Sequence, residues 1–231
     1  MQEESNIENC YNLASIKATN TQEEVGVANL NCGGIVGQGE ININKCYNTG
    51  NIILDGGNNG VAVGGICGSQ YDGESIENCY NNAKIEANSN LKRDEDRVYI
   101  GGIIGNLSTN NLRYCYNSGE ILGNGDRLYI GGITGNLMQD VIINNVFNIG
   151  KITIESEKNS EIYVGGINGG NANRNIQINN AYNIGSINVK HLDISSILGI
   201  GSIAGTNWSD LISFNNCYYL KGSYDVGVGG N

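Results

Sequence analysis

The sequence predicts an all-β protein, a single right-handed parallel β-helix of about six to seven coils over residues 1–231. Two motifs alternate along the whole chain at intervals of 30 to 37 residues. The apolar residues occur in short β-branched runs without a sustained helical period. Gly and Asn interrupt these runs at fixed offsets, as expected for strands joined by tight bends.

The first motif is an apolar triplet followed by two glycines and Ile-x-Gly, as in VYIGGIIG from residue 98. Alternation places Val98 and Ile100 on one face of a strand and Tyr99 on the other. If Ile103 also points inward, the chain must turn at the two preceding glycines, where a corner needs φ values or a close approach that a Cβ forbids. The first glycine recurs in steps of 31, 37, 30, 34 and 36 residues, at Gly33, Gly64, Gly101, Gly131, Gly165 and Gly201.

The second motif reads apolar-x-Asn-Cys-Tyr-Asn-x-Gly-x-Ile with small departures, as in IENCYNNAKI from residue 76. Seven copies of it interleave with six complete copies of the first motif. One pair of motifs supplies about three short strands and three bends, roughly one coil of a solenoid. A coil cannot bury its inner face alone, so we expect equivalent coils to stack at about 4.8 Å.

Stacking predicts that equivalent residues lie over one another along the axis. The isoleucines of the first motif should form an aliphatic ladder of Ile35, Ile66, Ile103, Ile133, Ile167 and Ile203. The asparagines of the second motif should form an amide ladder, bonded to one another and to backbone groups of the bend. These asparagines are Asn12, Asn48, Asn81, Asn117, Asn148 and Asn183.

The cysteines are explained by the same repeat. One ladder position holds Cys10, Cys46, Cys79, Cys115, Val146, Ala181 and Cys217. Because Val and Ala replace Cys there, the position requires a small buried apolar group rather than a ligand or nucleophile. The cysteines are odd in number, lack CxxC spacing and accompany a single His, which argues against a zinc site and a complete disulfide framework. We therefore expect no cofactor and no metal.

Charge narrows the set of partners. The net charge of −10 repels phosphate backbones and anionic lipid surfaces, so nucleic acid is not an expected partner. The chain has no apolar run long enough to cross a membrane, and its opening residues lack the features of a signal peptide. We expect no membrane contact within this chain.

The repeats resemble the GLUG motif, most closely in GGICGSQYDGESIENCYNNAKI from residue 64 and GGIIGNLSTNNLRYCYNSGEI from residue 101. This motif is found in large bacterial surface proteins and in non-catalytic regions of some IgA-cleaving metallopeptidases. The resemblance covers nearly the whole chain and carries no catalytic residues. It implies an exported, cell-surface or secreted location, a role as stalk or adhesive module, and fusion to further domains, in agreement with ends that fall within a repeat.

Candidate contact residues are aromatic. Tyr99, Tyr129 and Tyr163 should form an outward stripe that stacks against sugar rings or a host or cell-surface protein. Alternatively, the rings stack on each other beneath the variable inserts, and we favour this arrangement. Trp208 follows the last full turn, where we expect it to cover an exposed coil edge rather than bind a ligand.

The main alternative function is that of a carbohydrate-active β-helix enzyme, such as a polysaccharide lyase or glycosidase. Glycoside hydrolysis requires two carboxylates about 5–10 Å apart on one face. The acidic residues instead gather in inserts such as 91–97 and 155–161, and His191, the single histidine, also lies in an insert. We therefore expect a non-enzymatic module with no catalytic residues.

Overall fold

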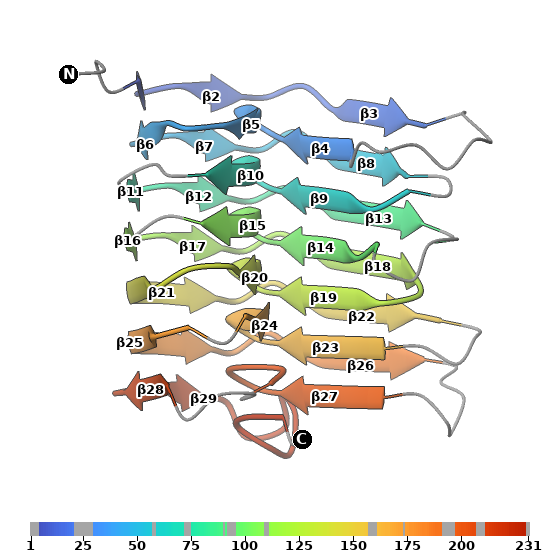
Figure 1. Cartoon of the computed structure of the whole chain (residues 1–231), viewed down its shortest axis with the longest axis vertical. Helices are drawn as coiled ribbons and strands as arrows, with labels where there is room; N and C mark the ends of the chain where they lie inside the picture. The colour runs from blue at the N-terminus through green and yellow to red at the C-terminus, as the bar shows by residue number, and fades with distance from the viewer. Residues whose placement is uncertain are drawn as a thin grey trace.

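Each coil of the chain passes through four parallel β-sheets, here called A, B, C and D in chain order (Figure 1). The computed structural model describes residues 5–20, 30–56, 59–71, 75–89, 91, 96–108, 111–156, 161–172, 174–190, 197–206 and 211–229. These residues form strands and no helix, which confirms the all-β prediction. Sheet C runs leftward at the front of Figure 1 and sheet B runs rightward behind it as the coils descend, which makes the coil right-handed.

The strands of each sheet come from successive coils. Sheet A contains β1 (Asn6–Glu8), β2 (Tyr11–Asn12), β6 (Asn42–Asn44), β7 (Tyr47–Asn48), β11 (Ser75–Glu77), β12 (Tyr80–Asn81), β16 (Asn111–Arg113), β17 (Tyr116–Asn117), β21 (Val141–Asn148), β25 (Ile176–Asn183), β28 (Ile212–Asn215) and β29 (Tyr218–Tyr219). Sheet B contains β3 (Ile16–Thr19), β8 (Ile52–Asp55), β13 (Ile85–Ser89), β18 (Ile121–Gly125), β22 (Ile152–Glu155) and β26 (Ile187–Lys190). Sheet C contains β4 (Leu30–Gly33), β9 (Val61–Gly64), β14 (Val98–Gly101), β19 (Leu128–Gly131), β23 (Glu161–Gly165) and β27 (Ile197–Gly201). Sheet D contains β5 (Val36–Gly39), β10 (Cys67–Tyr71), β15 (Ile104–Ser108), β20 (Thr134–Leu137) and β24 (Asn168–Asn171).

The number of complete coils is lower than the number of motif copies suggests. Within the described residues, five coils place a strand in all four sheets. The sixth coil reaches sheet D only through an isolated bridge between Asn168 and Ala204. The last turn adds β28, β29 and a bridge from Ala204 to Val228. The prediction of six to seven coils counted these two incomplete turns.

In sheet A, the residue before the Cys position has a positive φ, as at Lys45 (54°) and Asn78 (53°). The prediction of three strands per coil did not include this feature. Such a residue shifts the in–out alternation, so that Ile43 and Cys46, three positions apart, both point inward. Asn occupies this position in most coils, in keeping with its tolerance of the left-handed conformation.

The interior consists of two apolar clusters. The first contains the Cys position and the isoleucine ladder, including Ile103. The second lies between sheets B and C and includes Ile100. Gly101 and Gly102 form the corner between these two isoleucines, and a Cβ on Gly102 would lie 2.0 Å from the carbonyl oxygen of Gly132. The corner therefore requires glycine because the coils approach closely there.

Candidate interaction surface

The predicted ladder residues lie over one another in the structure. The backbone N–H of each ladder isoleucine donates to the carbonyl of its counterpart in the next coil at 2.9–3.0 Å, from Ile35 to Ile203. The ladder asparagines are bonded in the same way from Asn12 to Asn183, each Nδ2 donating to the next Oδ1 at 2.8–2.9 Å.

Each amide also closes its own bend. Asn117 is fully buried, its Nδ2 donates to the Gly119 carbonyl at 2.9 Å, and its Oδ1 accepts from the Gly119 N–H at 3.2 Å. The four hydrogen bonds of this side chain satisfy two backbone groups and two neighbouring amides.

The cysteines of the Cys position have the hydrogen bonds and burial of structural residues. The Cys79 thiol donates to the Glu77 carbonyl at 3.0 Å, with the Ile43 carbonyl oxygen 3.9 Å from Sγ, and none of the seven cysteines forms a disulfide. A neighbouring thiol and burial raise the pKa of Cys79, which keeps its thiol protonated. Cys10 in the first coil is exposed and Cys217 in the last is half-buried, whereas Cys46, Cys79 and Cys115 are buried.

The candidate tyrosine stripe is not an exposed surface. Tyr129 and Tyr163 are only 6% and 4% exposed, and Tyr99 is half-buried. The Tyr129 hydroxyl donates to Glu161 Oε1 at 2.6 Å, and its ring lies against Gly170, where a Cβ would come within 2.3 Å. The three rings pack on one another and on small residues of neighbouring strands, as in the stacked arrangement favoured from the sequence, so they do not form the alternative exposed stripe.

Burial and the neighbouring charges shift the pKa values of the tyrosines in this cluster. Burial raises the pKa of Tyr129, and the hydrogen bond to Glu161 adds to the effect. Burial, with the charge of Glu161, also raises the pKa of Tyr163 to about 12. Arg97 Nη2 lies 3.4 Å from Glu161 Oε2, which compensates the charge of that carboxylate.

A different aromatic column faces outward. The tyrosine of the Cys-Tyr-Asn motif stacks from coil to coil, with ring centroids 4.8–5.2 Å apart and ring planes within 11° of each other. We call this the outer aromatic column; its rings are Tyr11, Tyr47, Tyr80, Tyr116, Phe147 and Tyr182. Its end residues Tyr11 and Tyr182 are 60% and 41% exposed, and the rings between them are half-buried. The rings cover one another's faces, so the column presents mainly ring edges to solvent.

The sequence contained a signal for this column. In Cys79-Tyr80-Asn81 the two flanking residues belong to inward ladders, and alternation then requires the tyrosine between them to point outward.

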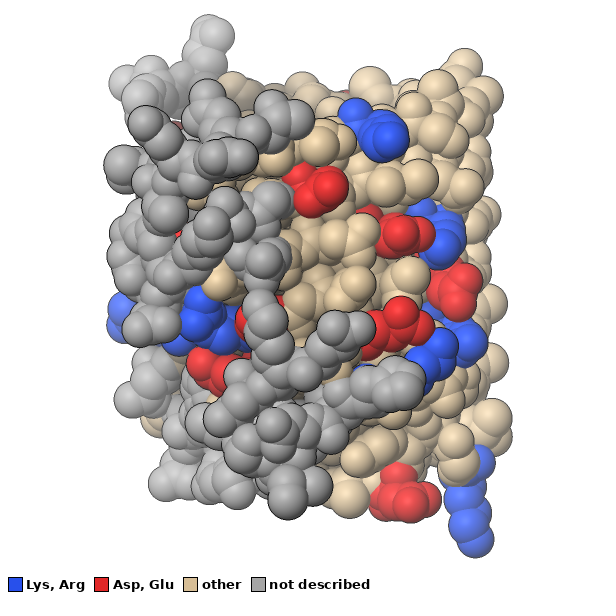
Figure 2. Space-filling view, turned by 90° about the vertical axis from the view of Figure 1, so that its right-hand side faces the viewer, with Lys and Arg blue, Asp and Glu red and all other residues tan. Residues whose placement is uncertain are grey.

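Several charged side chains on the surface are paired between coils. Arg113 Nη2 lies 2.8 Å from Glu77 Oε1, and Lys190 Nζ lies 2.8 Å from Glu155 Oε1. Basic and acidic side chains accordingly lie side by side on the face shown in Figure 2. Among the described residues, no three His, Cys, Asp or Glu side chains gather as a metal site would require.

Several predictions fall on residues that the structure does not describe. Trp208, His191 and most of the two acidic inserts lie outside the described residues. Within the described part of the chain, no helix is long and apolar enough to cross a membrane.

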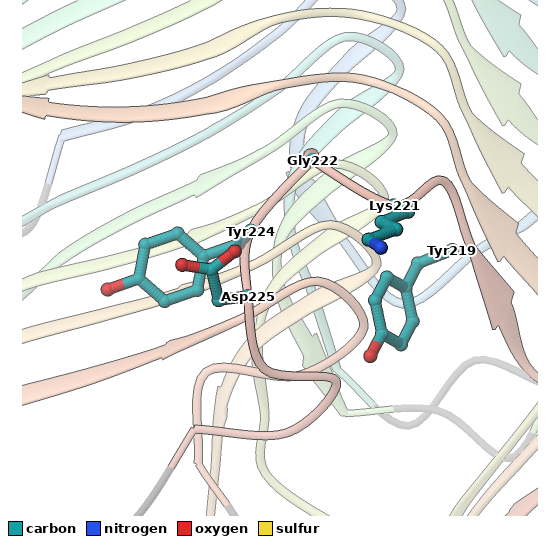
Figure 3. A pocket seen from close by; sticks show the side chains of 5 residues that line it. All are labelled: Tyr219, Lys221, Gly222, Tyr224 and Asp225. Atoms are coloured by element: carbon teal, nitrogen blue, oxygen red, sulfur yellow. The ribbon is translucent and has the colours of Figure 1, made fainter.

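A pocket of about 410 Å³ lies at the C-terminal end of the solenoid. It is lined by Tyr219, Lys221, Gly222, Tyr224 and Asp225. In Figure 3, Tyr219 and Lys221 lie on one side of the pocket and Tyr224 and Asp225 on the other. The residues that form this pocket depart from the repeat, so the repeat pattern does not predict it.

Comparison with known proteins supports the resemblance seen in the repeats. Residues 59–86 match the family model of the GLUG motif. The matched segment begins before β9, includes β10, β11 and β12, and ends within β13, so it follows the chain from sheet C around to sheet B. No curated protein and no solved structure matches the chain. This match and the stacked parallel sheets identify the chain as a β-solenoid repeat protein that carries the GLUG motif.

Proposed function

We propose that this chain is a non-enzymatic structural module of a bacterial surface or secreted protein, which acts as a stiff stalk and presents a contact surface. The main support for a stalk is that three kinds of ladder join the coils along one axis. Backbone hydrogen bonds, the amide ladder and the outer aromatic column all connect the first coil to the sixth. Bending the solenoid would strain all three together, which favours a stalk.

The outer aromatic column favours an adhesive role for the same module. Tyrosine supplies a large amphipathic contact area at a small cost in conformational entropy. Here stacking already orders the rings, so binding a partner would cost little further entropy.

An enzyme is the less favoured alternative. A glycosidase requires one carboxylic acid to give a proton and a second carboxylate to act as base or nucleophile. Glu77 and Glu155 instead face Arg113 and Lys190 from the next coil, as surface carboxylates of a scaffold do.

The stalk is tested by placing the chain between a bacterial surface anchor and an epitope, and measuring the distance of the epitope from the surface. A stiff stalk gives one narrow distance distribution, whereas a Gly/Ser linker of equal residue number gives a broad one. A distribution as broad as that of the linker would refute the stalk.

The adhesive role is tested on the same cells with Tyr80→Ser and Tyr116→Ser combined. We expect retention on glycan-coated or host-cell surfaces to fall. Tyr114→Ser is the matched control, because Tyr114 is exposed but lies outside the column. Equal retention by both variants would remove the column from the proposal. Release of reducing sugar from a polysaccharide panel, abolished by a single carboxylate substitution, would favour the enzyme.

A further inference from the structure

The C-terminal pocket forms where two departures from the repeat occur together. In earlier coils the second glycine of the corner faces the ladder asparagine of the next coil, and a Cβ on Gly166 would lie 2.2 Å from Asn183 Nδ2. In the last turn the residue in register with Asn183 is Tyr219. Tyr219 is 42% exposed and no longer occupies the inner position. The corner residue facing this last turn is accordingly Ser202, whose side chain has room once the amide is absent.

Both sides of the pocket are held in place before any ligand arrives. Ser202 Oγ donates to the Tyr224 carbonyl at 2.8 Å, and the Tyr224 side chain packs against the cluster between sheets B and C. The Tyr219 ring lies over Gly227, where a Cβ would come within 3.1 Å of its Cε1 atom. The Ser202 N–H donates to the Val226 carbonyl at 2.7 Å, which fixes the segment that follows the pocket.

A tight turn presents the charged residue on the Tyr219 side. The Ser223 N–H donates to the Leu220 carbonyl at 2.9 Å, and Gly222 has a φ of 95°. A positive φ at the third position is the signature of a type II turn, which requires glycine there. This turn projects Lys221 at its second position, next to Tyr219 in Figure 3.

The charges in the pocket balance. Lys221 and Asp225 are exposed, and neither forms an ion pair with another described residue. An anionic ligand would meet Asp225 and the chain's net charge of −10, and a cationic ligand would meet Lys221. The pocket therefore suits a neutral ligand that carries both hydrogen-bond donors and acceptors.

A pyranose has this chemistry. One face of the sugar ring is apolar C–H and packs on an aromatic ring, while neighbouring hydroxyl groups both donate and accept hydrogen bonds. The volume of about 410 Å³ lies within the range of small-molecule sites. We propose that this pocket binds a neutral pyranose unit of a glycan. Tyr219 packs against the sugar face, Lys221 donates to a sugar oxygen, and Asp225 accepts from a sugar hydroxyl.

The test is an NMR titration of the full chain with the methyl glycosides of glucose, galactose, mannose and N-acetylglucosamine. We expect saturable shifts with a Kd of about 1 mM or below for at least one glycoside. Tyr219→Ala should weaken binding about tenfold or more, and Lys221→Met and Asp225→Asn several-fold each. Tyr219→Phe should retain binding, since the ring remains.

The matched control is Tyr218→Ala, an exposed neighbour that does not line the pocket. We expect it to bind as the unaltered chain does, and thermal melting of each variant establishes that the fold is kept. The proposal is overturned if no glycoside binds, if Tyr218→Ala weakens binding as much as Tyr219→Ala, or if glucuronate or a free amino acid binds more tightly than every neutral glycoside.

Discussion

Replacing Asn117 by Ala tests the amide ladder where it is fully buried. The substitution removes four hydrogen bonds and leaves both the N–H and the C=O of Gly119 without the side chain that satisfied them. Gly119 is itself buried, so water does not replace this partner. An unsatisfied buried polar group costs about 1–3 kcal/mol, so the two groups predict a loss of about 2–6 kcal/mol in unfolding free energy.

Neighbouring amides limit the damage. Asn81 keeps its bond to the Ala83 carbonyl, and Asn148 keeps its bond from the Gly150 N–H. The expected loss therefore remains local to one bend. Urea unfolding followed by far-ultraviolet circular dichroism measures it as a lower transition midpoint at constant slope.

The same substitution at the open end of the ladder is the control. Asn12 lies in the first coil beside the exposed Ala14, so water can replace its bonds when it is removed. We expect Asn12→Ala to cost about 1 kcal/mol. If Asn117→Ala destabilises the chain no more than Asn12→Ala does, the buried amide ladder does not contribute what its geometry suggests.

Three further predictions concern the corners and the thiols. Gly132→Ala should destabilise the chain by about 3 kcal/mol, since its Cβ would lie 2.1 Å from a carbonyl oxygen. Gly39→Ala, whose Cβ would meet nothing nearer than 3.7 Å, should change the stability by no more than about 0.5 kcal/mol. Thermal melting compares the two variants, and equal effects would refute the close approach. Burial raises the pKa of Cys67 from 9.0 to about 12, so its contribution to stability is complete below pH 9 and falls by about 1.4 kcal/mol per unit towards pH 12. Cys67→Val should flatten this alkaline decline in urea unfolding, because Val36 fills the same ladder position, and an unchanged slope would count against it. Exposed Cys10 should react with a thiol reagent in the native state well before buried Cys67, and simultaneous modification would show that the core opens as a whole.

The repeat made the coil and its inner ladders predictable. Ile103 and Asn117 were placed correctly from spacing alone, because each has a counterpart at the same position of every neighbouring coil. A solenoid buries each residue largely against its own copies, so the local period contains most of the information about packing.

The exposure of the outward tyrosines depends on contacts that the spacing of the motifs does not predict. Alternation places both Tyr80 and Tyr129 outside the coil, yet the two differ in what lies over them. Tyr80 stacks in a column that water reaches, whereas Glu161 and Gly170 meet Tyr129 and bury it. Glu161 belongs to the next coil and Gly170 to a different sheet, so neither contact follows from the motif that contains Tyr129.

The sequence by itself determined that like residues stack along one axis, because the same two motifs recur in every coil and each packs against its own copy. Only the tertiary structure decided how the last turn ends. There Tyr219 leaves the amide position, Ser202 takes the space at the corner, and a pocket opens between Tyr219 and Tyr224. A residue that departs from the repeat has no copies of itself to pack against, so its particular neighbours place it, and those neighbours become known only once the chain has folded.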